Sequence, residues 1–138
     1  MSNINDFIIE NGVLQRYTGK DSEVIIPEEV IEVGDNAFKN LNITKIIIHD
    51  HVQKFDGQSI YGCSNLEFNI HDNAKYLGNE KNPYRFLIKA IANDIECCDI
   101  HEKTEWICSF AFSMNRALRE ITGGDGLIAI GHEAFWRC

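Results

Sequence analysis

Apolar positions recur along the chain at a regular spacing, and this repeat is the strongest pattern in the sequence. The segment 24–38 opens with an apolar triplet and closes with the pair Ala37-Phe38. The triplet returns 22 residues later as Ile46-Ile47-Ile48, and a third copy begins after another 22 residues at Phe68. Short apolar triplets of this kind predict β-strands, and the Ala-Phe stretch predicts a turn or a single helical turn.

Two further copies follow in the C-terminal half of the chain. The fourth begins at Cys98, 74 residues after Val24, and the fifth follows it at a distance of 23 residues. These copies carry Ala111-Phe112 and Ala134-Phe135 in the place of Ala37-Phe38. Because a unit of this size cannot bury its apolar face alone, we expect neighbouring units to stack with their strands in a parallel ladder. The alanines of the three pairs should then be buried.

Alternation along each strand divides its residues between an inner and an outer face. The residues expected to face the core are Val24, Ile26, Ile46, Ile48, Phe68, Ile70, Cys98 and Ile100. The residues expected to face outward on one sheet surface are Ile25, Ile47, Asn69, Asp99 and Thr122. Two isoleucines in register on an open face make this surface the predicted contact patch for a partner.

Two segments depart from the repeat. In the first, apolar runs flank Asn11-Gly12, a dipeptide that favours a two-residue hairpin turn, and we expect a hairpin that covers the first strand edge. The second is an insertion between Asn79 and Cys97, because the third and fourth copies start 30 residues apart. Turn residues at 79–83 and apolar residues at 86–91 predict a hairpin leading into the fourth repeat. This insertion is either part of a functional face or only a structural excursion.

The units resemble those of the BspA-type leucine-rich repeat family, whose pattern is roughly L-x-x-I-x-I-P-x-x-V-x-x-I-G-x-x-A-F-x-x-C. The resemblance extends over nearly the whole chain. It implies a leucine-rich-repeat solenoid that is mainly β, with one short parallel strand per repeat, short helical or 3-10 turns, a hairpin cap and an inserted hairpin. The expected organisation is a single domain, 1–138, with the cap at 1–20, repeats 1–3 at 22–78, the insertion at 79–97 and repeats 4–5 at 98–138.

The chain ends at Cys138, in the repeat position that Leu41 and Cys63 hold in earlier units. From the sequence we expect either a truncated chain or a C-terminal edge closed by a partner, including self-association through that open edge.

Composition and charge exclude several kinds of partner. The chain has 138 residues and a formal net charge of −8, from 13 Lys plus Arg against 21 Asp plus Glu. No basic cluster could neutralise a run of phosphates, so nucleic acid is not an expected partner. Apolar stretches are too short for a membrane span and the start is polar and acidic, so we expect no membrane insertion and no export signal. A cytoplasmic location follows by default, whereas the resemblance implies a cell-surface or secreted protein.

A column of histidines and carboxylates follows the strands. His49, His71 and His101 stand in the repeat position of Pro27. The acids that come after these four positions are Glu28, Asp50, Asp72 and Glu102. Neighbouring strands lie about 4.8 Å apart, so the acids would form a ladder of like charges that attracts cations or a basic partner. We therefore count them with the outer face as partner-binding candidates.

Imidazole and carboxylate are ordinary metal ligands, which makes His49, Asp50, His51 and His71 the candidates for a metal site. The sequence favours the alternative, a solvated row of turn residues without metal, because nothing in the pattern fixes a ligand geometry. Imidazoles stacked beside carboxylates also suggest sensitivity to pH.

Five cysteines lack the paired spacing of a zinc site or a disulfide scaffold, so we expect reduced, structural thiols. Cys63 and Cys138 should occupy a core position of the repeat. Cys98 should point inward and its neighbour Cys97 outward, which leaves Cys97 as the most reactive thiol.

The predicted function is a protein–protein interaction module that presents a repeat-built surface to a protein partner, with no catalytic residue and no cofactor. The resemblance implies adhesion or recognition of a host or matrix partner. The alternative is a metal- or pH-responsive sensor, or a small enzyme, that uses the histidine and carboxylate column. A recessed pocket where His49, His71 and Asp72 converge would favour this alternative, whereas the flat sheet that we expect would favour the binding module.

Overall fold

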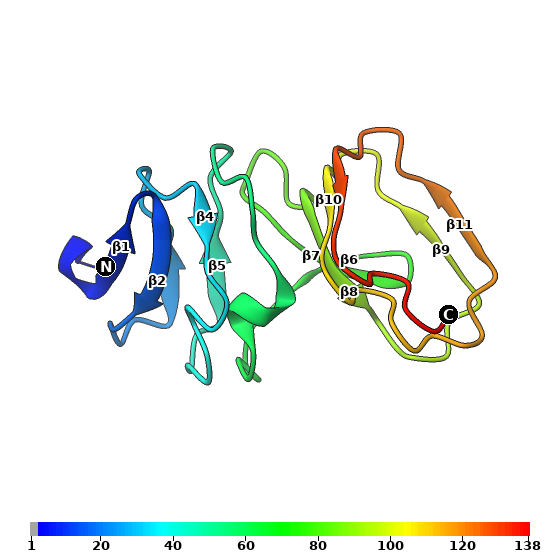
Figure 1. The fold of residues 1–138 in the computed structure, drawn as a ribbon, viewed down its shortest axis with the longest axis horizontal. Helices are drawn as coiled ribbons and strands as arrows, with labels where there is room; N and C mark the ends of the chain where they lie inside the picture. Colours follow the sequence, from blue (N-terminus) through cyan, green and yellow to red (C-terminus); the bar gives the residue numbers. More distant parts are fainter. Residues whose placement is uncertain (1–2) are drawn as a thin grey trace. The chain divides into compact units, whose positions relative to one another are not determined.

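The computed structural model describes residues 3–138, and the chain divides into two compact units, Met1–Glu67 and Phe68–Cys138. We call these unit 1 and unit 2, and each is described by itself. Both are mainly β and contain turns of a solenoid, so the predicted fold class is confirmed (Figure 1). No helix within residues 3–138 is long and apolar enough to cross a membrane. The predicted single domain and its internal boundaries stay a prediction.

Unit 1 begins with the predicted hairpin. Its elements are η1 (Ile4–Asp6), β1 (Phe7–Glu10), β2 (Val13–Tyr17), β3 (Glu23–Ile25), β4 (Glu32–Val33), β5 (Lys45–Ile47) and the 3-10 helix η2 (Gly57–Ile60). Strands β1 and β2 pair antiparallel around Asn11 and Gly12, whose φ angles of 52° and 79° are those of a type I′ turn. The hairpin continues into the repeats because β2 pairs parallel with β4.

The 22-residue repeat of unit 1 is visible in the pairing of its strands. Strands β3 and β5 run parallel, with Val24 opposite Ile46 and Ile25 opposite Ile47. Val24, Ile26, Ile46 and Ile48 are all buried, as alternation predicts. The turn that begins with β3 also holds a second short strand, β4, where the sequence predicted only a corner, because pairing there satisfies further backbone groups.

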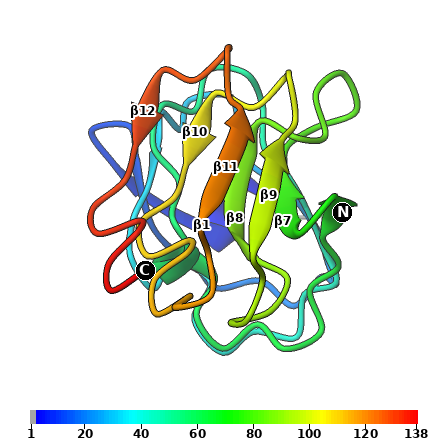
Figure 2. The same ribbon diagram turned by 90° about the vertical axis from the view of Figure 1, so that its right-hand side faces the viewer.

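Unit 2 also contains parallel repeat strands, but an antiparallel segment comes before them. Its strands are β6 (Asn69–His71), β7 (Ala74–Leu77), β8 (Phe86–Ala90), β9 (Cys97–Ile100), β10 (Trp106–Ile107), β11 (Glu120–Gly123) and β12 (Ala129–Ile130). Strands β6, β7 and β8 form an antiparallel meander, and β8, β10 and β12 continue its sheet in parallel. Strands β9 and β11 pair in parallel as a separate ribbon (Figure 2).

One prediction for the start of unit 2 is wrong. The triplet at Phe68 leads into a hairpin strand, β6, that runs antiparallel to β7, so Ile70 is 48% exposed and Phe68 only half-buried. The turn that follows β6 decides which strand becomes its partner, and apolar alternation alone cannot reveal it. The inserted hairpin is confirmed, because β8 pairs antiparallel with β7 on the other side of the turn residues 79–83.

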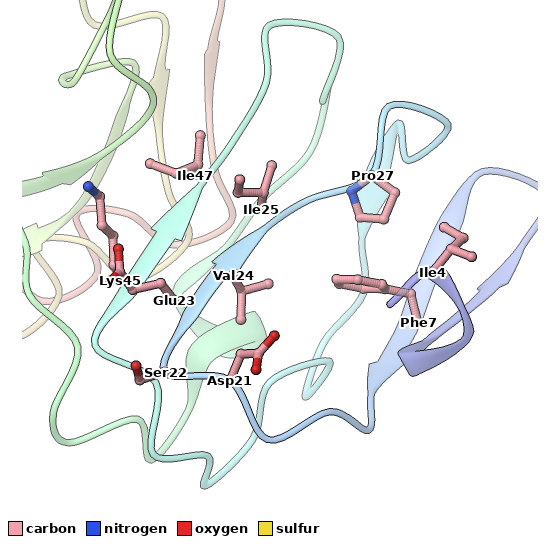
Figure 3. A pocket seen from close by; sticks show the side chains of 10 residues that line it. All are labelled: Ile4, Phe7, Asp21, Ser22, Glu23, Val24, Ile25, Pro27, Lys45 and Ile47. Carbon is pink, nitrogen blue, oxygen red and sulfur yellow. The ribbon is translucent and has the colours of Figure 1, made fainter. Parts of the chain in front are cut away.

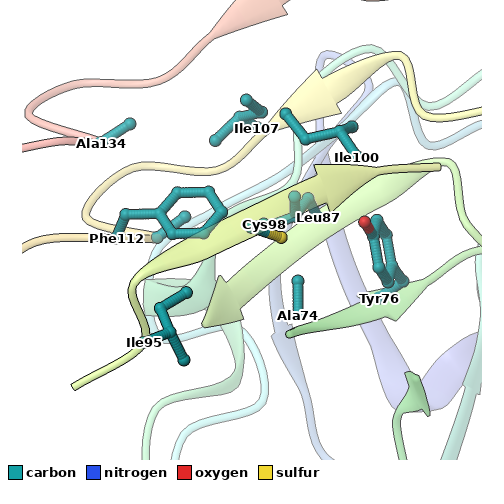
Figure 4. Close-up of a cluster of buried hydrophobic side chains, with 10 residues drawn as sticks. Ala74, Tyr76, Leu87, Ile95, Cys98, Ile100, Ile107, Phe112 and Ala134 are labelled. Atoms are coloured by element: carbon teal, nitrogen blue, oxygen red, sulfur yellow. The ribbon is translucent and has the colours of Figure 1, made fainter. Parts of the chain in front are cut away.

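The predicted burial of the three recurring alanines is confirmed. Ala37, Ala111 and Ala134 are between 1% and 4% exposed, and Phe38 and Phe112 are fully buried. In unit 2 the core gathers residues from the meander and from both repeats, including Ala74, Tyr76, Leu87, Cys98, Ile107 and Phe112 (Figure 4). The buried alanine leaves room for the phenylalanine of the same turn, which is why the pair recurs.

Candidate binding surface

A hollow in unit 1 brings together both isoleucines of the predicted contact patch. It has a volume of about 700 Å³ and lies between the N-terminal turn with β1 and the strands β3 and β5 (Figure 3). Its lining residues are Ile4, Phe7, Asp21, Ser22, Glu23, Val24, Ile25, Pro27, Lys45 and Ile47. Hollows of this size and apolar character are typical of binding sites. The surface is thus recessed where the sequence suggested a flat sheet.

The walls of the hollow are fixed by local structure on both sides. Parallel pairing sets Ile25 directly beside Ile47, and Ile25 is 64% exposed. On the other side, Ile4 sits in η1, where the Asn3 side chain accepts a hydrogen bond from the Asn5 backbone N–H at 3.0 Å. The Asp6 carboxylate in turn accepts from the backbone N–H of Asn3 at 3.3 Å. This reciprocal cap holds the turn that carries Ile4.

Sequence reasoning missed Ile4 and Phe7 because neither belongs to the repeat. The spacing of Asn3 and Asp6 ahead of an apolar run was the available signal, since it is that of a reciprocal helix cap.

The outer face of unit 2 is polar and its groups pair with one another. The Thr122 hydroxyl donates to Asp99 Oδ1 at 2.8 Å, and the Asp99 backbone N–H donates to Asp72 Oδ2 at 2.7 Å. His71 Nε2 lies 3.9 Å from Asp99 Oδ2. The Asn69 amide donates to the Pro83 carbonyl at 3.0 Å. These predicted partner-binding residues therefore have hydrogen-bond partners inside their own unit.

The carboxylates of the predicted column are all exposed. They are Glu28 and Asp50 in unit 1, and Asp72 and Glu102 in unit 2. Their role in binding a partner stays a prediction.

Of the four predicted metal ligands, His49 and His51 come together, and their third neighbour is Glu28. One donor atom from each of these three side chains lies within 4.8 Å of the others, the one such group found among residues 3–138. Asp50 is not part of the group, and His71 belongs to unit 2. The hollow contains neither His49 nor His71, so the recessed surface is not the pocket that the sensor or enzyme hypothesis required.

A second cluster of imidazoles lies in unit 2 and is packed with tyrosines. The rings of Tyr84 and His101 stack with centroids 4.0 Å apart, and the His71 ring meets His101 edge-on at 4.8 Å. Burial, followed by the nearby charge of His71, lowers the pKa of His101. Burial also raises the pKa of Tyr76, whose hydroxyl accepts from the His101 backbone N–H, to about 12. The insertion supplies Tyr84, and it thereby covers the end of β9.

The cysteines agree in part with the structural role predicted for them. Cys98 is buried and burial raises its pKa to about 11, while Cys97 is exposed. The Cys63 and Cys138 thiols donate to the carbonyls of Phe38 and Phe112, at 2.9 and 3.0 Å. Burial raises the pKa of Cys63, which is half-buried. Cys138, expected in the core, is instead exposed.

Stacked parallel strands joined by short turns, with a buried alanine at each recurring Ala-Phe pair, define a leucine-rich-repeat protein. The profile of the BspA type Leucine rich repeat region matches six copies in this chain, over residues 3–81 and 90–138. The chain belongs to this family, and the resemblance seen in the sequence is confirmed. The family consists of repeat-built interaction or surface modules and is not generally enzymatic.

Two solved structures are similar to the chain. One is a leucine-rich repeat protein from Eubacterium ventriosum ATCC 27560, at 18% identity and a TM-score of 0.43, with 83% of this chain and 45% of that chain covered. The other is a leucine rich cell surface protein from Faecalibacterium prausnitzii A2-165, at 19% identity and a TM-score of 0.41, with 99% and 43% covered. The chain spans less than half the length of either protein. No curated protein matches the sequence.

Proposed function

We propose that this chain is a protein-binding module, and not an enzyme, that engages its partner through the hollow of unit 1. The observation that supports this is the exposed apolar wall formed by Ile25 beside Ile47, opposite the exposed Ile4. Covering apolar surface gains about 25 cal/mol per Å², and such side chains have no other way to leave water. Apolar hollows with polar rims mark interaction sites in proteins.

The occupant that we propose is a protein segment with a large apolar side chain next to basic residues. The hollow is apolar at its walls, and its polar lining includes Asp21 and Glu23 against the single cation Lys45. Glu28 follows the lining residue Pro27, and the whole chain carries a net charge of −8. Complementary charge at the rim would steer a basic segment and favour it over an acidic one.

The family's association with adhesion suggests where such a partner is found. We extend the proposal to recognition of a host or matrix protein, with self-association through the β11 and β12 edge as a separate form of binding. Partner binding uses the hollow of unit 1 and self-association uses a strand edge of unit 2, so the two forms of binding can be tested separately.

The experiment is a selection of peptides from a random display library on the immobilised chain, followed by titration of the enriched peptides. We expect an aromatic or large aliphatic residue adjacent to Lys or Arg. Ile25→Asp should weaken binding by about tenfold or more, which corresponds to ~1.4 kcal/mol. Ile128→Asp is the matched control, because Ile128 is 72% exposed but belongs to unit 2. Enrichment of acidic peptides, or equal binding by both variants, would overturn the proposal.

A further inference from the structure

Three side chains at the strand ends of unit 1 form a cluster that takes no part in the hollow. Glu28 lies in the turn after β3, and His49 and His51 lie in the turn after β5. Since β3 and β5 pair in parallel and in register, the residues that follow them meet at the same edge. The repeat therefore brings the Glu28 carboxylate next to two imidazoles that follow it by 21 and 23 positions in the sequence.

The distances between the donor atoms of these groups are close to those between the ligands of a single metal ion. His51 Nδ1 lies 3.8 Å from Glu28 Oε2, and a donor atom of His49 lies within 4.8 Å of both. Ligands that hold zinc at about 2.0–2.2 Å lie roughly 3–4 Å from one another. The three donor atoms therefore need to approach one another only slightly to bind one ion. The side chains of His51 and Glu28 are 78% and 82% exposed, and they are free of the tight packing that would resist such a rotation.

A backbone carbonyl fixes the tautomer of His49. Its Nε2 lies 2.8 Å from the carbonyl oxygen of Pro27, which can only accept, so Nε2 carries the proton. The lone pair is then on Nδ1, which accepts a longer bond of 3.2 Å from the His51 backbone N–H, and a metal ion bound at Nδ1 would replace this bond. A carbonyl that accepts from the other ring nitrogen of a ligating histidine is the usual arrangement in metal sites.

We propose that Glu28, His49 and His51 bind a divalent transition metal ion, with water completing its coordination. Two imidazoles and one carboxylate favour zinc, nickel or copper over calcium or magnesium, which prefer all-oxygen sets. The negative charge of the chain favours the approach of a cation. The site requires no protein partner, so it stands or falls independently of the proposed function.

Unit 2 offers a matched control in an exposed His–Glu pair without a third ligand. His132 Nε2 lies 3.5 Å from Glu133 Oε1, and the His132 side chain is 75% exposed, close to that of His51. Within residues 3–138 this pair forms part of no group of three donors. Replacing His51 or His132 thus removes one imidazole from a similarly exposed position in each case.

The test is a calorimetric titration of the metal-free chain with zinc chloride near pH 7.5, in a Cys97→Ser, Cys138→Ser background that removes the exposed thiols. We expect one zinc per chain, with affinity weakened about tenfold or more by His51→Ala and by Glu28→Gln, and unchanged by His132→Ala. Affinity should also fall near pH 5.5, because protons compete for the imidazoles. Absence of zinc binding, or equal affinity in all variants with unchanged circular dichroism, would overturn the proposal.

Discussion

In unit 1 the outer face of the paired strands carries Ile25 beside Ile47, whereas in unit 2 the equivalent face carries Asp99 beside Thr122. The two ribbons have the same parallel pairing and the same alternation. In unit 2 the outward groups satisfy one another through hydrogen bonds, so that face needs nothing more. In unit 1 the isoleucines can be removed from water only by a molecule that covers them. The same repeat fold therefore carries a polar, internally hydrogen-bonded face in unit 2 and an exposed apolar face in unit 1.

The ends of the same strands differ as well. Pro27 in unit 1 and His101 in unit 2 occupy the same repeat position. In unit 2 the insertion places Tyr84 on His101, and the His71 ring meets the same histidine edge-on, while His101 stays partly exposed. In unit 1, the side chains of His51 and Glu28 near the equivalent position are 78% and 82% exposed. The insertion thus supplies an aromatic contact to the histidine at this corner of unit 2.

The largest expected effect is the loss of stability when a core phenylalanine is truncated. It tests whether the cores of unit 1 and unit 2 contribute equally to stability, although the outer faces of the two units differ. Phe38→Ala and Phe112→Ala should each destabilise the protein by about 3–5 kcal/mol, because both rings are fully buried and each leaves a cavity. Urea unfolding followed by circular dichroism measures both variants. Tryptophan fluorescence reports unit 2 alone, since both tryptophans, Trp106 and Trp136, belong to it.

The control for this experiment is Phe110→Ala. Phe110 follows the same strand as Phe112 but is 38% exposed, so its loss should cost less than about 1 kcal/mol. A loss that small at Phe38 or Phe112 would show that the repeat does not place that ring in a core.

A smaller effect is expected from opening the polar face of unit 2. Asp99→Ala removes the acceptor of the Thr122 hydroxyl, and should cost about 1 kcal/mol because both side chains are exposed. Thr122→Val and the double variant complete a mutant cycle that isolates the pair. A coupling energy of zero would contradict the view that this face is satisfied internally.

Much of this architecture could be predicted from the sequence because the repeat constrains many positions at once. The buried Ala37 and Ala111, the Asn11-Gly12 turn and the opposite directions of Cys97 and Cys98 follow from spacing and alternation. The direction of β6 does not. An apolar alternation reads the same in a hairpin strand and in a repeat strand, and the choice depends on Asp72, which turns the chain with a φ of 51°.

The candidate site was predictable only in part for a related reason. Ile25 and Ile47 follow from alternation, but the opposite wall with Ile4 depends on a short capped turn outside the repeat. In the same way, the sequence proposes that His71 and His101 belong to a solvated column. It cannot show that Tyr84 stacks on His101, since this contact joins residues from two separate loops.

A weaker effect concerns pH and arises at His101, in the aromatic cluster of unit 2. Burial and then the charge of His71 lower the pKa of His101, and Lys103 acts in the same direction, while Glu102 and Asp99 oppose it. Unfolding restores the ordinary pKa of about 6.5, so the unfolded chain binds more protons below that pH. Stability is therefore fully present above about pH 6.5 and falls as the pH decreases below it, towards the lowered pKa of the folded state.

Thermal melting at several pH values, followed by tryptophan fluorescence, measures this dependence. His101→Gln should reduce the loss at acidic pH, whereas His132→Gln, at an exposed position, should leave it unchanged. The same acid sensitivity in His101→Gln as in the parent chain would mean that other groups cause it.

The smallest change in stability is expected where the largest change in binding is proposed. Ile25→Ser should alter the free energy of unfolding by no more than about 0.5 kcal/mol, because the side chain is 64% exposed and fills no cavity. Urea unfolding of this variant should overlay that of the parent, while binding of the selected peptides decreases. Ile26→Ser, one residue further on and only 1% exposed, should instead cost several kcal/mol. A large loss from Ile25→Ser would mean that this isoleucine stabilises the fold, and the apolar face of unit 1 would then need no partner to explain it.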